Sequence, residues 1–598
     1  MPRLRQIDDE ALEAPFNKRQ FFRLLRYLLP YKNQMLFALL LMVTYAVCGI
    51  AGPYFMSQVV AAMDNGAAIN VAEIVKYVLL MIGAAVFGGL LLRWRVRITD
   101  TAGRRAIATL RQELFEYIQH LSFDFFDSRS AGKIMVRVIN DVNSLNDLFA
   151  NGIINLLIDC LTLVLLLVIM LSVNWQLTLV SLASLSILAV LIATIKRKMR
   201  LAWQIVRSKI SNMNGYLHES LAGMRVTQSF AREPYNQEVF ADVADDIRSS
   251  WMKAVRYNGL FWPAIDITST VGTVAVYLVG LYLMRNVVSL PLSALLLILW
   301  YLGRFWDPIN NLSNFYNSLL SAMASVERIY EIFDTPIQVK DAEGAGEMPE
   351  IVGDVEFDHV SFAYDKGVPV LKDVNFKAKA GETIALVGPT GAGKSTVVNL
   401  ISRFYNAGGG RVLIDGVDIS KVKLHSLRKQ MSVMMQDSFI FSGTIIDNIR
   451  YGRLDATDAE VTEAAKAVFA HDFIMNMEKG YNTEVNERGS SLSAGQKQLI
   501  SFARALLNDP RILILDEATS SIDTHTEQLI QKAIERLLVG RTCFIIAHRL
   551  STIRKASQIL VVQGGNIQER GTHEELIRLP NGHYKGLCDA QYAFFTKA

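Results

Sequence analysis

The clearest chemical signal in the sequence is a glycine-rich stretch between an apolar run, Thr383–Val387, and a helical pattern over residues 395–404. The stretch consists of Gly388, Pro389, Thr390, Gly391, Ala392, Gly393, Lys394, Ser395 and Thr396. It matches the pattern G-x-x-x-x-G-K-[ST], in which the backbone N–H groups of a tight loop point at phosphate oxygens and a helix N-terminus adds its positive dipole. Lys394 is predicted to reach the β- and γ-phosphates of a nucleotide, and the hydroxyl of Ser395 to ligand Mg²⁺. A chance glycine-rich turn would not place strand, motif and helix in this order.

Two further apolar runs end in polar residues that suit a phosphate site. Residues 511–515 form one run, which ends in Asp516 and Glu517, and residues 544–547 form the other, which ends in His548. Ligands of parallel sheets bind beyond the carboxyl ends of the strands. Asp516 is therefore predicted to hold Mg²⁺ through its water shell, and Glu517 to polarise the water that attacks the γ-phosphate. His548 is predicted to contact the γ-phosphate, and a purely structural histidine is the alternative.

A second helix N-terminus with anion-binding character lies further along the chain. Ser493 and Gln496 form a capping-box pattern before a helix predicted over Ala494–Leu507. Such an N-terminus suits an anion. An ordinary helix cap explains the same spacing, and the spacing alone does not decide between the two.

Composition indicates more than one domain, with the apolar residues concentrated in particular segments. The chain has 598 residues, of which 51% are hydrophobic and 20% charged. The formal net charge of +4 is too small to indicate a nucleic-acid partner. The four cysteines are scattered and suggest neither a disulfide framework nor a zinc site. The acidic start of the chain, before any apolar run, lacks the order of a cleavable signal.

Six apolar runs in the first half are each close to the ~20 residues needed to cross the hydrocarbon core of a membrane. A very apolar soluble bundle is disfavoured because the runs have polar, basic flanks. The runs lie at residues 35–60, 74–92, 153–173, 177–195, 261–284 and 290–308.

Lysine and arginine gather at alternate ends of these runs. They are frequent in residues 18–32, 93–111 and 196–200, whereas residues 61–73 contain none. Because cytoplasmic loops carry the excess of positive charge, both termini are predicted to be cytoplasmic, in a multi-pass protein of the plasma (inner) membrane. Residues 21–29 are predicted to form a short amphipathic helix along the inner surface.

The two long cytoplasmic loops have apolar residues at helical spacing, within residues 107–121 and 210–224. We therefore expect the flanking membrane helices to continue into the cytoplasm and to turn back near residues 125–128 and 219–223. The apolar tips of these two hairpins need a partner, and the second half of the chain is the candidate.

The second half has the pattern of an α/β domain. Its buried-strand runs alternate with helical patterns, which indicates a parallel sheet, and the Gly/Glu-rich residues 341–349 indicate a linker. The expected organisation has four parts. They are an N-terminal cytoplasmic segment with the amphipathic helix (1–32), a membrane all-α six-helix transmembrane domain with long cytoplasmic helical extensions (33–330), a linker (331–352) and a P-loop α/β ATPase domain (353–598).

Nearly the whole chain resembles the ABC transporter superfamily, specifically exporter-type half-transporters that fuse six spans to one nucleotide-binding domain. Leu492-Ser493-Ala494-Gly495-Gln496 resembles the signature LSGGQ, with Ala494 in place of the usual glycine. Residues 483–489 (TEVNERG) resemble the exporter loop TEVGERG, and residues 520–523 (SSID) resemble the D-loop. The resemblance implies that Tyr364 stacks on adenine, that Gln436 senses Mg²⁺ and the membrane domain, and that His548 is the switch histidine.

In that family, the signature helix of one nucleotide-binding domain closes on the ATP held by the P-loop of another. The resemblance therefore implies two chains facing head to tail, in which Ser493, Gly495 and Gln496 of one chain complete the ATP site of the other. Binding of ATP with Mg²⁺ would pull the hairpin tips near Phe126 and Glu219 together and shift the membrane helices from inward-facing to outward-facing. Hydrolysis would reset the cycle. Whether the second chain is a copy or a related chain stays open.

The resemblance further implies ATP-driven export of an amphiphile such as a drug or lipid. An ATP-gated channel or a regulatory membrane protein of the same architecture is the alternative. Ionisable residues in membrane spans are costly and often functional, and the candidates here are Asp159, Asp266, Arg304 and Asp307. Asp159 and Asp266 are candidates for a polar cavity that favours cationic amphiphiles. Arg304 and Asp307 are three residues apart, so a simple pair on one helix face is the alternative for them.

Overall fold

The computed structural model describes residues 17–64, 71–146, 148–286, 290–365, 367–435, 438–516, 523–546 and 553–595. The chain divides into two compact units. Unit 1 comprises residues 1–118 and 132–334, and unit 2 comprises residues 119–131 and 335–598.

Unit 1 is helical throughout its described segments. Its helices are α1 (Lys18–Leu25), η1 (Arg26–Tyr31), α2 (Lys32–Asp64), α3 (Val71–His120), α5 (Ala131–Val136), η2 (Arg137–Asp141), α6 (Val142–Ser144), η3 (Leu148–Gly152), α7 (Ile153–Val173), α8 (Trp175–Ala222), α9 (Met224–Ser229), α10 (Glu233–Gly259), α11 (Phe261–Asn286), α12 (Leu292–Arg304) and α13 (Trp306–Phe333). The predicted amphipathic helix over residues 21–29 corresponds to α1 and η1.

Several of these helices are long and apolar enough to cross a membrane. Within the described part of the chain, five segments meet that condition by length and composition. They are Lys18–Met63, Val71–His120, Asn155–Val173, Asp266–Arg285 and Leu292–Phe333. The remaining predicted run, residues 177–195, lies in α8.

Two helices are much longer than a membrane is thick. α3 has 50 residues and α8 has 48. At 1.5 Å per residue these lengths are roughly 75 and 72 Å, against a hydrocarbon core of about 30 Å. The prediction that membrane helices continue far beyond the hydrocarbon core is therefore confirmed.

The helix predicted as continuous over residues 290–308 is interrupted. α12 ends at Arg304, and α13 begins at Trp306. The cause is Pro308, because a proline lacks the N–H for the carbonyl four residues earlier and its ring crowds that carbonyl, which here belongs to Arg304.

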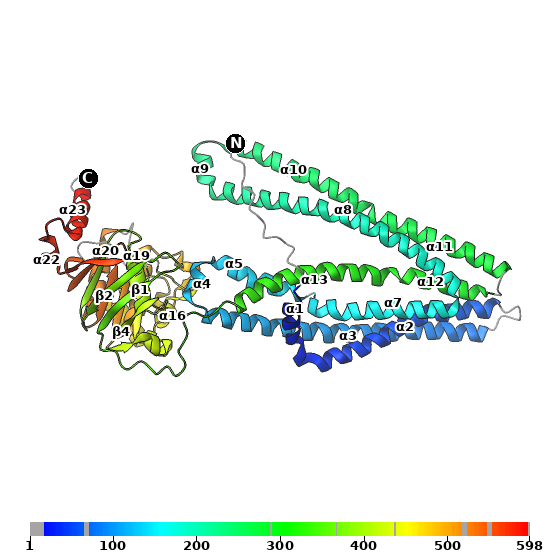
Figure 1. Ribbon diagram of the computed structural model, residues 1–598, viewed down its shortest axis with the longest axis horizontal. Helices are drawn as coiled ribbons and strands as arrows, with labels where there is room; N and C mark the ends of the chain where they lie inside the picture. The colour runs from blue at the N-terminus through cyan, green and yellow to red at the C-terminus, as the bar shows by residue number, and fades with distance from the viewer. Residues whose placement is uncertain are drawn as a thin grey trace. The chain divides into compact units, whose positions relative to one another are not determined.

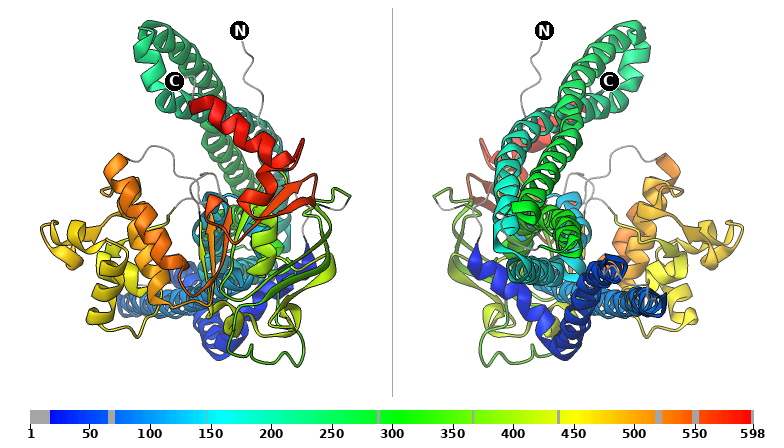
Figure 2. Two further views of the ribbon diagram at one scale, coloured as in Figure 1. Left: turned by 90° about the vertical axis from the view of Figure 1, so that its left-hand side faces the viewer. Right: turned by 90° about the vertical axis from the view of Figure 1, so that its right-hand side faces the viewer.

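The second predicted hairpin is present in unit 1. α8 runs beside α10 and α11, with α9 at the turn, as Figures 1 and 2 show. Gly223 caps α8 by donating its backbone N–H to the carbonyl of Glu219 at 2.8 Å. The turn predicted near residues 219–223 is therefore confirmed.

Unit 2 is an α/β assembly. Its strands are β1 (Val355–Phe362), β2 (Leu371–Ala378), β3 (Thr383–Val387), β4 (Gly409–Ile414), β5 (Val417–Asp418), β6 (Met431–Met434), β7 (Gly443–Thr444), β8 (Glu484–Val485), β9 (Ile512–Asp516), β10 (Thr542–Ile546), β11 (Gln558–Gln563) and β12 (Asn566–Gly571). Its helices are α4 (Phe123–Asp127), α14 (Lys394–Ile401), η4 (Ile419–Lys421), α15 (Leu424–Arg428), α16 (Ile445–Arg450), α17 (Asp458–Ala467), α18 (His471–Met475), η5 (Gly480–Asn482), η6 (Glu487–Gly489), α19 (Ala494–Leu507), α20 (Thr524–Leu538), α22 (His573–Ile577) and α23 (His583–Phe595).

The main sheet is the predicted parallel one. Its strand order is β12-β11-β3-β10-β9-β6, and the five strands from β11 to β6 are parallel. A second, antiparallel sheet has the order β2-β1-β4-β5. Alternate residues of each central strand enter different cores: Leu513 packs against the helices that include α19 and α20, whereas Ile512 and Ile514 pack between the two sheets. This two-sided burial explains the continuous apolar runs in the sequence.

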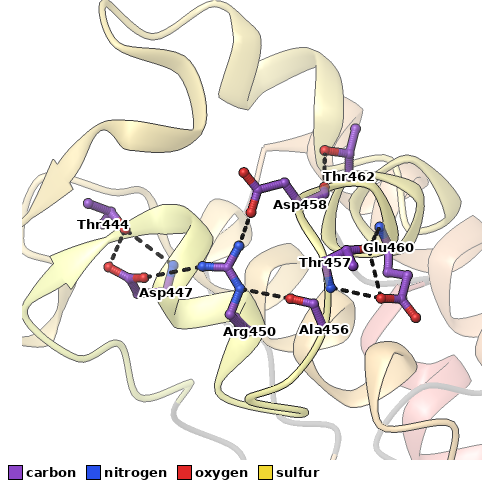
Figure 3. Close-up of polar contacts among 8 residues, drawn as sticks. All are labelled: Thr444, Asp447, Arg450, Ala456, Thr457, Asp458, Glu460 and Thr462. Carbon is purple, nitrogen blue, oxygen red and sulfur yellow. Dashed lines mark hydrogen bonds and ion pairs between the residues drawn. The ribbon is translucent and has the colours of Figure 1, made fainter.

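In unit 2, a polar network around Arg450 connects α16 with α17, as Figure 3 shows. Arg450 ends α16, donates to the carbonyl of Ala456 at 3.1 Å and pairs with Asp458 at the start of α17. Thr457 and Glu460 cap α17 reciprocally. The loop between the two helices is thus held at both ends.

The tip of the first hairpin, α4, belongs to unit 2. The ring of Phe123 stacks on Phe404 with centroids 5.1 Å apart, and the backbone N–H of Val339 donates to the hydroxyl of Ser122 at 2.8 Å. Phe125 is buried. The prediction that the apolar tip near residues 125–128 packs against the second half of the chain is therefore confirmed.

Candidate functional site

The glycine-rich loop joins the end of β3 to α14, and two of its positions require glycine. Gly388 has φ 149° and Gly393 has φ 107°. A Cβ on Gly388 would lie 2.1 Å from the carbonyl oxygen of Val562, and one on Gly393 would lie 2.8 Å from a methyl group of Leu371. The loop therefore keeps its curled path only without these side chains.

Lys394 is folded back onto its own loop. Its side chain is buried, and Nζ donates to the carbonyls of Gly388 at 2.8 Å and Pro389 at 2.9 Å. Burial lowers the pKa of this amine, and the nearby carboxylate of Asp516 acts in the opposite direction. Phosphate oxygens are stronger acceptors than carbonyls, so the amine is placed to exchange its two carbonyl partners for a triphosphate.

The C-terminal ends of several parallel strands lie at the edge of the sheet beside this loop. β3 ends at Val387, β9 at Asp516 and β10 at Ile546, and the register pairs Ile546 with both Asp516 and Leu386. Asp516 is half-buried, whereas the predicted metal ligand Ser395 is exposed at the start of α14. Asp516 and the loop thus lie at the same, carboxyl edge of the sheet, where ligands of parallel sheets bind.

Tyr364 is part of a three-ring cluster at the start of α14. Its ring meets Phe362 edge-on at 4.8 Å and Tyr405 edge-on at 5.0 Å between centroids. Its hydroxyl lies 3.2 Å from that of Thr396, in the glycine-rich loop motif. The Tyr364 side chain is 42% exposed, so an aromatic surface beside the phosphate loop stays open. Such a surface suits stacking of a nucleotide base.

Tyr405 was missed by reasoning from the sequence. Its hydroxyl donates to Asp127 of α4 at 2.5 Å, and burial together with that hydrogen bond raises the pKa of the phenol. One side chain therefore contacts both the ring of Tyr364 and the tip of the first hairpin. A cavity of about 110 Å³ lies beside it, lined in part by Ser122 and Asn406. Tyr405 and Asp127 are 278 residues apart in the sequence, so no local pattern links them. The only sequence signal for Tyr405 is that an aromatic residue follows α14 closely.

The predicted capping box at α19 is confirmed. The N–H of Ser493 donates to Oε1 of Gln496 at 2.9 Å, and the N–H of Gln496 donates to Oγ of Ser493 at 3.3 Å. Ser493 is exposed, whereas Gly495 is buried. Within the described residues, no hydrogen bond or ion pair joins this helix end to the glycine-rich loop.

Three predicted site residues lie outside the described residues: Gln436, Glu517 and His548. They follow β6, β9 and β10 in the sequence, and these strands are parallel. Their predicted roles stay predictions.

The oxygen donors present fit Mg²⁺ better than a softer metal. Ser395 and Asp516 offer hard oxygen ligands, and Mg²⁺ is commonly bound by one or two such groups with substrate phosphates. Across the described chain, no group of three or more His, Cys, Asp or Glu side chains could hold a metal ion by itself. The protein thus offers part of a coordination shell that a nucleotide would complete.

The intramembrane candidates differ in their surroundings. Asp159 is buried and accepts from Nδ2 of Asn311 at 3.3 Å. Arg304 donates to the backbone carbonyl of Gly49 at 2.7 Å. Asp266 is exposed. Only Asp159 of these lies in a polar contact between α7 and α13.

Comparison with known sequences accounts for both halves of the chain. The family model described as "ABC transporter transmembrane region" matches residues 35–304, and the one described as "ABC transporter" matches residues 371–520. The chain belongs to the ABC transporter family. It is an integral membrane protein whose nucleotide-binding domain couples ATP hydrolysis to transport, and its half-transporter architecture implies dimerisation.

The relatives of this ABC transporter match over most of their length. The uncharacterized ABC transporter ATP-binding protein YknV of Bacillus subtilis is 44% identical over 98% of this chain and 96% of its own. A fatty acid ABC transporter ATP-binding/permease protein of Mycobacterium tuberculosis is 38% identical over 87% of this chain and 82% of its own. Among solved structures, a bacterial Atm1-family ABC exporter with ATP bound is similar, with a TM-score of 0.77, 29% identity, and coverage of 94% of this chain and 98% of that one. The fold is therefore that of an ABC exporter.

Proposed function

We propose that two copies of this chain, or this chain and a related one, form an ATP-driven exporter that moves an amphiphile out of the cytoplasm or the inner leaflet. One observation carries the proposal: the same chain contains long apolar helices and a phosphate-binding loop motif. The lysine of that motif donates to carbonyls of its own loop, which a triphosphate could replace. ATP on the cytoplasmic side is the energy source, so both termini lie in the cytoplasm.

Each residue of the site takes a role that its chemistry fits. The backbone of Gly388–Thr396 and the amine of Lys394 bind the phosphates, and Tyr364 stacks on the adenine. Ser395, Gln436 and Asp516 hold Mg²⁺. Glu517 orients the attacking water, and His548 contacts the γ-phosphate. These roles are carried by residues 353–598, our proposed nucleotide-binding domain.

The N-terminus of α19 contacts the ATP molecule that is bound by the phosphate loop of the second chain. A phosphate loop covers one side of the triphosphate and leaves the other side open to water. The exposed Ser493, with the Gly495 amide and Gln496, caps that open side from the second chain. Two chains facing head to tail then enclose two ATP molecules, and hydrolysis opens the pair.

The substrate class follows from the location of the pathway and from the relatives. The long helices of unit 1 expose many large apolar side chains, which suits a substrate that enters among them from the lipid, and one relative is named a fatty acid transporter. A lipid or drug-like amphiphile fits both facts. An ATP-gated channel of the same architecture is the second candidate.

A transport assay on the purified chain distinguishes the two candidates. The chain is reconstituted alone in vesicles with its nucleotide-binding domain outside. Amphiphile-stimulated ATPase activity with accumulation of a fluorescent fatty acid in the vesicle lumen supports the exporter. ATP-dependent conductance without accumulation refutes it in favour of the channel. Absence of all ATPase activity from the chain alone would show that it needs a related partner.

The role of Glu517 has its own test. Glu517→Gln keeps the shape of the side chain but removes the carboxylate that polarises water, so we expect ATP binding with turnover reduced by about 10²-fold or more. Trapped dimers in size-exclusion chromatography with ATP would accompany this loss. Near-normal turnover in this variant would mean that a residue other than Glu517 polarises the attacking water.

A further inference from the structure

Within unit 1, the amphipathic segment α1–η1 is held against α3 and the end of α13. Nη1 of Arg23 lies 2.9 Å from both carboxylate oxygens of Asp334, at the end of α13. The hydroxyl of Tyr27 donates to Glu113 of α3 at 2.6 Å. Leu24 is 1% exposed. These contacts fix the orientation of the helix, so the side chains on its outer face have defined positions.

That outer face borders a cavity rich in arginine. Arg19, Phe22, Arg23 and Arg26 are spaced three, one and three residues apart and share one face of a helix. With Asp334 they line a cavity of about 530 Å³. This volume lies in the range of small-ligand sites, about 300–1,000 Å³.

The described residues around this cavity carry more positive than negative charge. Among the described residues that line the cavity, Asp334 alone is acidic, and Arg23 donates to both of its carboxylate oxygens. Arg19 and Arg26 make no ion pair with any acidic side chain in the described parts of the chain. Two guanidinium groups therefore line the cavity without an acidic partner among the described residues, and a phosphate is the anion that their fork geometry fits best.

Apolar surface adjoins the same arginines. Phe22 is 64% exposed and Leu29 is 61% exposed. A neighbouring cavity of about 440 Å³ shares Arg23 and Arg26 and continues along Pro30 and several aromatic residues, among them Tyr31. The first long apolar helix, α2, begins directly after η1. The ligand that suits this combination has an anionic head and an apolar body.

We propose that this cavity, which we call the elbow site, binds the phosphate headgroup of an anionic phospholipid. The lipid comes from the membrane leaflet in which α2 begins, next to α1 and η1. Arg19 and Arg26 hold the phosphate, and Arg23 stays with Asp334 as the anchor of the helix. Phe22 and Leu29 pack against the acyl chains. Basic pockets at the cytoplasmic ends of membrane helices are suited to such lipids. The elbow site consists of unit 1 residues, whereas the proposed ATP site consists of unit 2 residues, and the proposal is independent of which substrate is exported.

Lipid affinity tests the elbow site directly. The full chain in detergent is titrated with phosphatidylglycerol and with phosphatidylcholine of the same acyl chains, and retained lipid is counted by native mass spectrometry. We expect preferential retention of phosphatidylglycerol. The double variant Arg19→Gln/Arg26→Gln is expected to bind it about 10- to 30-fold more weakly.

A matched control separates a site from general charge. Arg104→Gln/Arg248→Gln removes the same charge from exposed arginines on α3 and α10, whose side chains are 70% and 77% exposed. This control is expected to bind phosphatidylglycerol as the unaltered chain does. An equal loss of affinity in both double variants would overturn the proposal. Equal binding of the two lipids by the unaltered chain would also overturn it, and that comparison needs no variant to fold.

A soluble phosphate identifies the source of the ligand. In the same titration, sn-glycerol 3-phosphate carries the head without the acyl chains. Competition only at concentrations far above those of the lipid supports a lipid site. Competition at equal concentration would show that the acyl chains contribute nothing, and the site would then be one for free phosphates.

Discussion

At Lys394, the folded chain already satisfies a buried amine with the carbonyls of its own loop. Lys394→Ala removes the donor from the carbonyls of Gly388 and Pro389 and removes the positive charge that we propose binds the phosphates. Removal of one charged or hydrogen-bonding group aimed at a developing anion typically costs about 10²–10³ in turnover. We expect ATPase activity of the purified chain to fall by that factor.

The control for this change is another lysine of unit 2. Lys423 is exposed and pairs with Glu347 at 2.7 Å, far in sequence from the loop. Lys423→Ala is expected to leave ATPase activity within about twofold, because exposed ion pairs contribute little. Similar losses in both variants would mean that Lys394 acts on stability alone.

At the scale of the elements, Tyr405 connects Tyr364, the proposed adenine-stacking residue, to the hairpin helix α4. Tyr405→Phe keeps the ring against Tyr364 and removes only the hydrogen bond to Asp127. Asp127 is exposed, so we expect the bond to contribute about 1 kcal/mol to the folded state of unit 2.

A double-mutant cycle measures this connection. Tyr405→Phe, Asp127→Asn and the double variant are compared by thermal unfolding and by amphiphile-stimulated ATPase activity. We expect the two single changes to be non-additive, with basal ATPase activity kept and stimulation reduced in each. Additive effects on both readouts would mean that the hydrogen bond does not couple the two elements.

A second connection between elements lies within unit 1. Asp141 in η2 is buried, and its two oxygens accept from Arg328 of α13 at 2.6 and 2.9 Å, with Ser325 at 3.1 Å. Arg328→Met leaves this carboxylate buried without its cation, which typically costs about 3–5 kcal/mol. Since the Arg328 side chain is 35% exposed, we expect the lower end of this range.

Thermal unfolding of the purified chain checks this change. Arg248→Met alters an arginine that is 77% exposed and is expected to shift stability by no more than about 0.5 kcal/mol. An unchanged unfolding midpoint in Arg328→Met would show that water or another group compensates Asp141.

These elements differ in how far the sequence could predict them. The phosphate loop and α19 have complete local signals, namely obligatory glycines and a capping box, so their residues could be predicted one by one. The break at Phe305 also has a local cause, Pro308. It was not predicted because residues 290–308 form one apolar run, which indicates a continuous helix. The contacts Tyr405–Asp127 and Asp159–Asn311 join residues 278 and 152 positions apart. No spacing rule links such residues, because packing of whole helices brings them together.

At the scale of the whole molecule, the proposed sharing of ATP sites leads to a prediction that can be tested only with two different variants in one dimer. In the proposed dimer, each site takes Lys394 from one chain and Ser493 from the other. Lys394→Ala alone damages both sites of a homodimer, and so does Ser493→Ala. A dimer of one chain of each kind has one site with both defects and one site with neither.

Co-expression of the two variants under different affinity tags, followed by purification through both tags, isolates this mixed dimer. We expect it to recover ATPase activity that both single-variant homodimers lack, because its second site is intact. The control is a mixed dimer in which one chain carries both substitutions and the other carries none. That control has one defect in each site and should stay inactive. Activity in the control but not in the first mixed dimer would place Lys394 and Ser493 of the same chain in one site, and the head-to-tail arrangement would be wrong.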